Sequence, residues 1–258
     1  GCGLATMIVY LVMAMATIIY SKVSPLMGPL KLYSQPLTLD IAIFKDLLKI
    51  GVPIALTFLT EVTLFAAVAI LLAPLGYLQV AAHQVAINFS SIVFMLPLSI
   101  AMAVAIRVSY LLGKGDAQTT IITIRVSRWF TILCATLTAF LTISFATWII
   151  SIYTNDIAVT DYAIPILFLA ALFQISDAVQ VISANALRGY KDTSWMLGLC
   201  IISYWVIGLP LGVVLGLTDW FVPAMAAQGL WIGIIVGLSI AAVLLHIRMK
   251  YFQHHYMQ

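Results

Sequence analysis

Charged residues are scarce in this sequence. Asp, Glu, Lys and Arg together make up 8% of the 258 residues, against about 25% in soluble globular domains. Hydrophobic residues make up 64% of the chain, and its mean hydropathy is +1.13. This composition leaves no room for a sizeable soluble domain, so we expect an integral membrane protein.

Cysteine is also rare. Cys2, Cys134 and Cys200 lie in or near apolar stretches, far apart in the sequence. Their spacing indicates neither a disulfide framework nor a metal site, and we expect them to be small buried apolar residues. The sequence also lacks a phosphate-binding GxxxxGK[ST] loop, so nothing supports an ATP-driven pump.

Long apolar runs, by contrast, are abundant. About 20 helical residues are needed to cross the ~30 Å hydrocarbon core of a bilayer. The runs do not alternate polar and apolar residues as the strands of a membrane β-barrel do. The sequence therefore predicts an all-α integral membrane protein with about seven transmembrane helices. We place them at about 4–21, 50–74, 79–106, 129–153, 162–187, 195–217 and 222–247.

The distribution of the 12 Lys and Arg residues predicts the topology. They fall into alternate connections between the expected spans, whereas the opposite loops hold Asp156, Asp161 and Asp219. By the positive-inside rule the basic side is cytoplasmic, which places the C-terminus inside and Gly1 outside. The basic residues are Lys22, Lys31, Lys45 and Lys49 after the first span, Arg107, Lys114, Arg125 and Arg128 after the third, Arg188 and Lys191 after the fifth, and Arg248 and Lys250 after the seventh.

The net charge of +3 is consistent with this orientation. Basic residues on the cytoplasmic side favour contact with anionic lipid headgroups. A nucleic-acid partner is not expected, because no basic face is free of the membrane.

Two acidic residues stand alone inside apolar spans. Glu61 is the only charged residue between Lys49 and Arg107, and Asp177 is the only one between Asp161 and Arg188. A carboxylate deep in a membrane helix costs roughly 2.5–3.5 kcal/mol on insertion scales, so such residues are usually functional. The two acids point to a transporter that handles cations or protons.

The two acids are expected at similar depth. Glu61 follows Lys49 by twelve residues, which is about 18 Å of helix, and Asp177 precedes Arg188 by eleven residues, about 16 Å. Secondary transporters place coupling-ion sites near the bilayer midplane. We therefore predict one shared pocket for Na⁺ or H⁺, the alternative being that each acid makes a separate polar packing contact.

Polar residues recur on one face in two of the expected spans. A polar stripe is unfavourable in lipid, so these faces should turn toward each other or toward water. Hydrogen bonds that merely hold the helices together remain an alternative. His83, near the outer end of its span, is expected to be an interfacial polar residue. The stripes are Gln84, Asn88 and Ser91 in the third span, and Phe173, Asp177 and Gln180 in the fifth.

Glycine repeats every four residues in the last two spans. Small residues at this spacing let helix backbones approach closely, so we expect these two helices to pack tightly, with each other as the simplest arrangement. The repeats are Gly208, Gly212 and Gly216, and Gly229, Gly233 and Gly237.

Three segments resemble one transporter family. They are AAHQVAINFSSIVFMLPLSIAMAVAIRVSYLLGKGD at 81–116, NALRGYKDT at 185–193, and LPLGVVLGLTDW with GLWIG within 209–233. All three are similar to segments of the multidrug and toxic compound extrusion (MATE) family, and within it to the NorM-type bacterial members. The segments follow the family order and spacing, and the resemblance covers nearly the whole chain.

The resemblance implies a division of the chain. The family has twelve helices in two six-helix lobes, so residues 1–21 would be the last helix of a missing N-terminal lobe. Residues 22–49 would be a cytoplasmic linker, 50–250 the six-helix C-terminal lobe, and 251–258 a cytoplasmic tail. The opening GCGLATMIV has no initiator Met and no signal sequence, which agrees with our interpretation of the chain as a fragment.

The resemblance also implies a function. The family's coupling acids on its seventh and tenth helices match Glu61 and Asp177, which would be the Na⁺ ligands if the ion is sodium. Phe173 stands where the family has an aromatic or hydroxyl partner, but it lacks an oxygen. Asp156 matches an outer-loop acid that helps to hold cationic drugs in some members. The implied protein is an antiporter of the bacterial inner membrane, coupled to Na⁺ or H⁺, which exports amphipathic, mostly cationic drugs and has no resident cofactor.

Other membrane proteins fit the sequence less well. A retinal protein needs a Lys inside a span, and an intramembrane aspartyl protease needs two Asp residues and a Gly-x-Gly-Asp motif; both features are missing. A flippase for lipid-linked precursors is the serious alternative. It should carry basic residues in its cavity, whereas the basic residues here are expected at the cytoplasmic edge.

Overall fold

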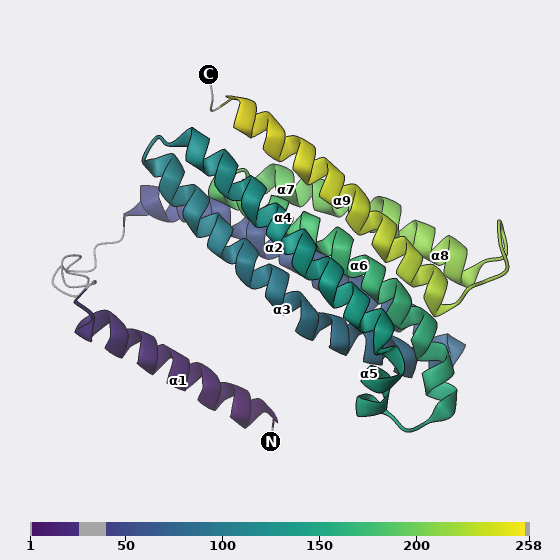
Figure 1. Ribbon diagram of the computed structural model, residues 1–258. Coiled ribbons are helices and arrows are strands. Elements are labelled where there is room, and N and C mark those ends of the chain that lie inside the picture. The colour runs from purple at the N-terminus through teal and green to yellow at the C-terminus, as the bar shows by residue number, and fades with distance from the viewer. Residues whose placement is uncertain (1, 26–39, 256–258) are drawn as a thin grey trace. The chain divides into compact units, whose positions relative to one another are not determined.

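The computed structural model describes residues 2–25 and 40–255 (Figure 1). The chain forms two compact units, Gly1–Asp46 and Leu47–Gln258. The first contains α1 (Cys2–Val23) and the beginning of α2 (Ile41–Leu72). The second contains the rest of α2 and all later elements.

Helices account for the regular structure of the described residues. After α2 come the 3₁₀ turn η2 (Ala73–Leu75), α3 (Tyr77–Gly113), α4 (Ala117–Ser144), α5 (Ala146–Tyr153), α6 (Ile157–Gly189), α7 (Thr193–Ile201), the π-helical segment η3 (Ile202–Gly208), α8 (Leu209–Leu217) and α9 (Ala227–His255).

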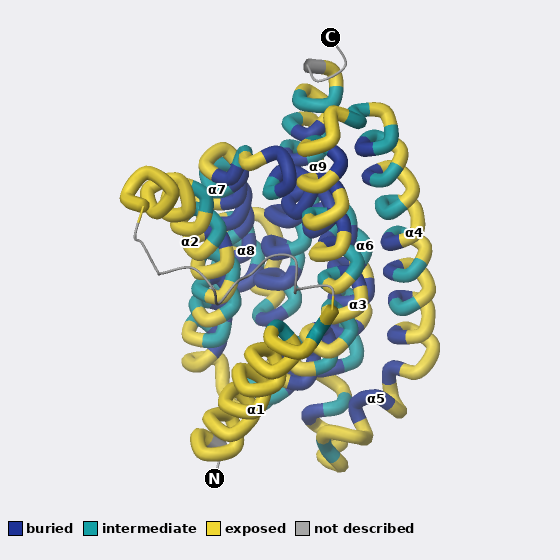
Figure 2. Tube along the Cα trace, turned by 90° about the vertical axis from the view of Figure 1, so that its left-hand side faces the viewer, coloured by how far each residue is buried: buried dark blue, intermediate teal, exposed yellow. Residues whose placement is uncertain are grey.

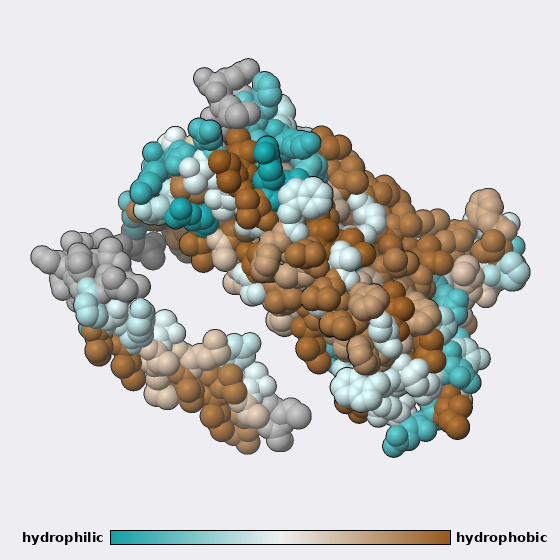
Figure 3. All heavy atoms as spheres, viewed as in Figure 1, coloured by the Kyte–Doolittle hydropathy of each residue, from teal (hydrophilic) through white to brown (hydrophobic). Residues whose placement is uncertain are grey.

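The prediction of seven membrane helices is confirmed. Within the described residues, seven helices or continuous helical stretches are long and apolar enough to span a bilayer. Figure 3 shows apolar residues along the middle of these helices and hydrophilic ones gathered toward their ends. The protein is therefore a multi-pass membrane protein.

The expected bounds of the fourth span were wrong. The stretch expected at 129–153 is occupied by the end of α4 and by the short, separate helix α5. Helix α4 begins at Ala117, where the Asp116 carboxylate accepts a hydrogen bond from the backbone N–H of Thr119 (2.9 Å). Hydrogen bonding to Thr119 holds the pKa of Asp116 below its usual value, as expected for an N-cap.

Nine of the eleven Lys and Arg residues that the structure describes lie within helices and two lie between them, which corrects the expectation that they occupy loops. Arg107 is in α3, Arg125 and Arg128 are in α4, Arg188 is in α6 and Arg248 is in α9. The reason is helix length: α3 has 37 residues and is about 55 Å long at 1.5 Å per residue, so it exceeds the ~30 Å hydrocarbon core. Lys31 lies outside the described residues.

The helix α6 forms the centre of the second unit. It packs against α3, α4 and α9, and 67% of its apolar stretch is buried. Figure 2 shows this concentration of buried residues along α6. Many of its inward positions are small, including Ala163, Ala170 and Ala178, which are all fully buried. Small side chains allow neighbouring helices to approach α6 from several sides.

The helix α2 is held much less closely. Its buried side chains are Thr57, Leu64, Val68 and Leu72, and 17% of its apolar stretch is buried. Among the residues that the structure describes, one direct hydrogen bond joins it to the later helices, from the indole N–H of Trp205 to the backbone oxygen of Thr60 (3.2 Å). The helix therefore forms one wall of the unit rather than part of its centre.

The glycine repeats bring α8 and α9 together, which confirms the predicted close packing of the last two spans. A Cβ added at Gly229 would overlap the backbone of Gly216, and one added at Gly233 would overlap that of Gly212. At Gly237 the added atom would lie 2.8 Å from the backbone oxygen of Ser203. Only glycine allows this backbone contact.

Candidate ion-binding cavity

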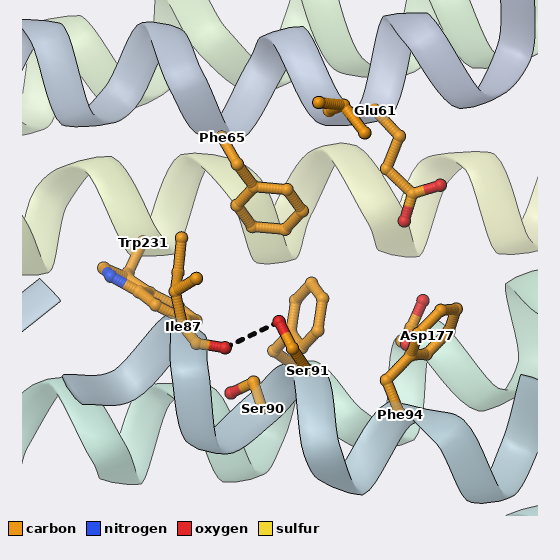
Figure 4. Close-up of a pocket in the computed structure, with 10 residues that line it drawn as sticks. Glu61, Phe65, Ile87, Ser90, Ser91, Phe94, Asp177 and Trp231 are labelled. Carbon is orange, nitrogen blue, oxygen red and sulfur yellow. Dashed lines mark hydrogen bonds between the residues drawn. The ribbon is translucent and has the colours of Figure 1, made fainter. Parts of the chain in front are cut away.

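A cavity of about 210 Å³ opens between α2, α3, α6 and α9 (Figure 4). Both isolated acids line it, Glu61 from α2 and Asp177 from α6. In Figure 4 their carboxyl groups point toward one another across the cavity. The full lining is Glu61, Val62, Phe65, Ile87, Ser90, Ser91, Phe94, Phe173, Asp177 and Trp231.

Asp177 is the more deeply buried of the two acids. Its side chain is 3% exposed, and its Oδ1 is buried without a hydrogen-bond partner. Burying an uncompensated carboxylate is costly, so such groups are normally paired, protonated or bound to a cation. The position of Asp177 therefore calls for a proton or a cation from the cavity.

Glu61 is half-buried on the less tightly packed helix. The positive charge of Arg188 acts on it electrostatically. The Arg188 guanidinium itself lies over the ring of Phe58 (4.8 Å to the centroid) and donates to Oδ1 of Asn185 (3.2 Å). Arg188 does not line the cavity, which leaves the two carboxylates as its charged groups.

Aromatic side chains form the other half of the cavity. Phe173 makes edge contacts with Phe65 and Trp231, each with 6.0 Å between ring centroids. The indole N–H of Trp231 donates to Nδ1 of His83 (3.1 Å). His83 is 1% exposed, so it is a buried partner of the aromatic wall; that it lies at the level of the outer interface stays a prediction. The cavity thus joins a carboxylate end to an apolar, aromatic end.

The predicted polar stripes divide between the cavity and its surroundings. Ser91 and Phe173 line the cavity with the two acids. Gln84 and Asn88 are exposed on α3 and outside the cavity; the Asn88 amide donates to the backbone oxygen of Gln84 (2.9 Å). Asp156 is exposed and caps α6, its carboxylate accepting from the backbone N–H of Ala158 (2.9 Å).

Gln180 belongs to a separate buried contact. Its Nε2 donates to the hydroxyl of Tyr204 in η3 (2.9 Å), and both side chains are buried. It lies three residues after Asp177, on the same helix. Gln180 therefore ties the helix that carries the buried acid to the π-helical segment, outside the cavity lining.

Several cavity residues escape prediction from the sequence. Phe65, Phe94 and Trp231 are ordinary apolar residues of their spans, and nothing in the pattern separates them from lipid-facing aromatics. Ser90 is buried, and its hydroxyl has no hydrogen-bond partner. Its position next to Ser91, which belongs to a predicted polar stripe, was the one feature of the sequence that could have indicated a place in the cavity. Oxygen ligands of this kind suit hard cations. Within the described residues, no group of three or more His, Cys, Asp or Glu side chains could hold a transition metal.

A comparison with known families identifies the fold. The profile of the MatE family matches residues 53–214. The chain belongs to the MatE family. The matched part of this MatE chain contains Glu61 and Asp177, together with every other cavity residue except Trp231.

Relatives extend the match over the whole chain. The probable multidrug resistance protein NorM of Shewanella oneidensis is 46% identical over 255 residues, which are 99% of this chain and 56% of that protein. The multidrug resistance protein NorM of Vibrio vulnificus is 46% identical over 97% of this chain and 55% of its own length. The chain therefore spans about half the length of these curated relatives.

Solved structures show the same fold. A eukaryotic MATE transporter superposes with a TM-score of 0.79 at 21% sequence identity, over 92% of this MatE chain and 53% of that protein. A MATE structure described as being in the straight conformation superposes with a TM-score of 0.82 at 17% identity, over 95% of this chain and 54% of that one. The predicted all-α fold class is thus confirmed; the division into linker, lobe and tail stays a prediction.

Proposed function

We propose that this MatE chain is the coupling half of a secondary antiporter that exports amphipathic, mostly cationic compounds in exchange for Na⁺ or H⁺. One observation carries the proposal: two carboxylates from separate helices face one cavity, and an oxygen of Asp177 is buried there without a partner. The names of the NorM relatives, which describe multidrug resistance, support drugs as the cargo.

The proposed cycle rests on competition for the cavity. An ion enters from outside, down its gradient, and is held between Asp177 and Glu61. Cargo uses the same acids and the aromatic wall of Phe65, Phe173 and Trp231, so ion entry releases it. A membrane potential of 100 mV contributes about 2.3 kcal/mol per charge moved, which is enough to bias such an exchange.

The proposal leaves Na⁺ and H⁺ as the two coupling ions. Phe173 contributes no oxygen, so further ligands for Na⁺ would come from hydroxyls that line the cavity, Ser90 and Ser91. A proton needs no further ligand. Transport of the same cargo in proteoliposomes, driven by a sodium gradient or by a pH gradient, distinguishes the two ions.

The flippase alternative is less well supported. A pyrophosphate headgroup would need basic side chains in the cavity, and no Lys or Arg lines the cavity described above. Its two charged residues are both acids, which favours a cationic cargo.

Neutralising the two acids in the full-length protein tests the proposal. We expect Glu61→Gln and Asp177→Asn each to abolish ethidium efflux from intact cells at normal membrane expression. Asp161→Asn is the matched control, because Asp161 is an exposed acid on the same helix as Asp177. Near-normal efflux in both cavity variants would show that neither acid couples transport.

We also propose that the chain lies in the bacterial inner membrane with its C-terminus in the cytoplasm. The segregation of basic residues supports this orientation. In single-cysteine variants, an impermeant maleimide should label Asn155→Cys in intact cells but Lys191→Cys only after lysis. The reverse pattern would overturn the topology.

A further inference from the structure

A second hollow lies on a different face of α6 from the ion cavity. It is a groove of about 410 Å³ between α4 and α9, and part of α6 forms its floor. In Figure 1 the ribbon of α6 is visible between those of α4 and α9, and α6 packs against both helices. The lining is Arg128, Ile175, Ser176, Val179, Ser239, Ala242, Val243, His246 and Ile247.

Arg128 has no anionic partner in this groove. Its guanidinium contacts Nε2 of His246 (3.3 Å) and donates to the Met249 sulfur (3.9 Å), and its Nε is buried without a hydrogen-bond partner. Within the described residues, no carboxylate lies within salt-bridge distance of Arg128. An imidazole nitrogen and a thioether are weak partners for a cation with five donors.

The state of His246 follows from this contact. Arginine stays protonated in proteins and can only donate, so Nε2 of His246 must accept and the ring proton must sit on Nδ1. That Nδ1 is also buried without a hydrogen-bond partner. The groove therefore contains the Arg128 cation and two N–H donors without acceptors, Nε of Arg128 and Nδ1 of His246.

Further positive charge surrounds the groove. Arg125 acts electrostatically on Arg128, and Lys250 acts on His246. The lining contains no acidic residue. Arg125, Arg128 and Lys250 belong to the set of Lys and Arg residues that the positive-inside rule assigns to the cytoplasmic side.

The rest of the groove is apolar or internally satisfied. Ser176 and Ser239 hydrogen-bond to each other (2.9 Å), and Val179, Val243 and Ile247 supply apolar walls. A matching ligand must carry a negative group at one end and a hydrocarbon chain at the other. Basic pockets between membrane helices on the cytoplasmic side bind anionic lipid headgroups in this way.

We propose that the groove between α4 and α9 binds an anionic phospholipid of the cytoplasmic leaflet. The lipid phosphate takes the unfilled acceptor position at Arg128, and one acyl chain runs along Val179, Val243 and Ile247. This site lies apart from the ion cavity, and the inference does not depend on the proposed transport function.

Lipid binding to the full-length transporter tests the site. The protein is purified in detergent, and retention of phosphatidylglycerol and phosphatidylcholine is measured by native mass spectrometry. We expect selective retention of phosphatidylglycerol, and about fivefold weaker retention in Arg128→Gln. Arg107→Gln is the matched control, since Arg107 is an exposed cation near the C-terminal end of α3 and does not line the groove; this variant should bind as the unaltered protein does.

A second variant distinguishes the contribution of the groove's apolar walls to lipid binding from that of the Arg128 charge. Val243→Trp keeps Arg128 and fills the groove, and it should also reduce retention. Equal retention of the two lipids by the unaltered protein would overturn the proposal, as would an equal loss in the Arg128 and Arg107 variants. Displacement of the lipid by millimolar inorganic phosphate would show a site for soluble anions and would overturn it too.

Discussion

The two acids of the ion cavity are carried by helices that differ sharply in packing. Asp177 lies on α6, where 67% of the apolar stretch is buried, and Glu61 lies on α2, where 17% is buried. The side chain of Asp177 is 3% exposed, whereas that of Glu61 is half-buried. One acid thus belongs to the fixed centre of the unit and the other to a loosely held wall.

This difference indicates how ion binding can be connected to a change of shape. A ligand held between a fixed and a weakly held element favours the arrangement that brings the two together. An ion between the carboxylates would draw α2 toward α6, because α6 is braced on several sides and α2 is not. The comparison therefore predicts that substitutions affect stability more strongly on the α6 side than on the α2 side.

Equivalent leucine truncations should show the largest contrast. Leu167 on α6 and Leu64 on α2 are 0% and 1% exposed. We expect Leu167→Ala to lower the free energy of unfolding by about 2–4 kcal/mol, because the residues around Leu167 cannot move in to fill the space left by the removed side chain. Leu64→Ala should cost about half as much, since α2 can shift inward. Thermal unfolding of the two full-length variants measures both losses of stability. Equal losses would contradict the proposed difference in packing between α6 and α2.

Added methyl groups should give the next largest effect. Gly233→Ala places a Cβ against the backbone of Gly212, and we expect a loss of about 1–3 kcal/mol. Gly51→Ala on α2 is the matched control, because a Cβ there meets nothing within 4 Å; the expected change is within about 0.5 kcal/mol. Unfolding in detergent measures both. A loss at Gly51 as large as at Gly233 would show that α2 is packed as tightly as α9.

Loss of the tie between α2 and η3 should give the smallest effect. Trp205→Phe removes the hydrogen bond to the Thr60 carbonyl, at a cost of about 0.5–1 kcal/mol. Hydrogen exchange should rise in α2 and stay unchanged in α6. Trp129→Phe, at an exposed position of α4, should change neither helix. Faster exchange in α6 would indicate that the two helices are coupled rather than independently held.

Much of the fold is visible in the sequence because crossing a bilayer requires long apolar runs. The error in the fourth span has a clear cause. Arg125 and Arg128 were assigned to a loop because they are charged, yet a helix can carry such side chains to the membrane surface while its backbone hydrogen bonds continue.

The cavity is only partly predictable for a related reason. Helix rise fixes the depth of a residue, which is why Glu61 and Asp177 were expected at one level. Depth does not fix rotation about the helix axis, and a helix that is apolar all round gives little information on it. Asn88 therefore faces away from the cavity, and Trp231 enters it from a helix that the polar pattern did not connect with the acids.

The π-helical segment η3 has a consequence for any positional scan of the span from Thr193 to Leu217. Each turn of this segment takes in an extra residue compared with an α-helix, so the faces of α7 and α8 are out of phase with a single continuous helical wheel. Accessible positions in a cysteine scan should recur every three to four residues in α7 and again in α8, with a longer interval across Ile202–Gly208. Cys200 in α7 and Gly212 in α8 are both buried. A helical wheel drawn at about 100° per residue through the whole span would give the wrong angle between these two positions.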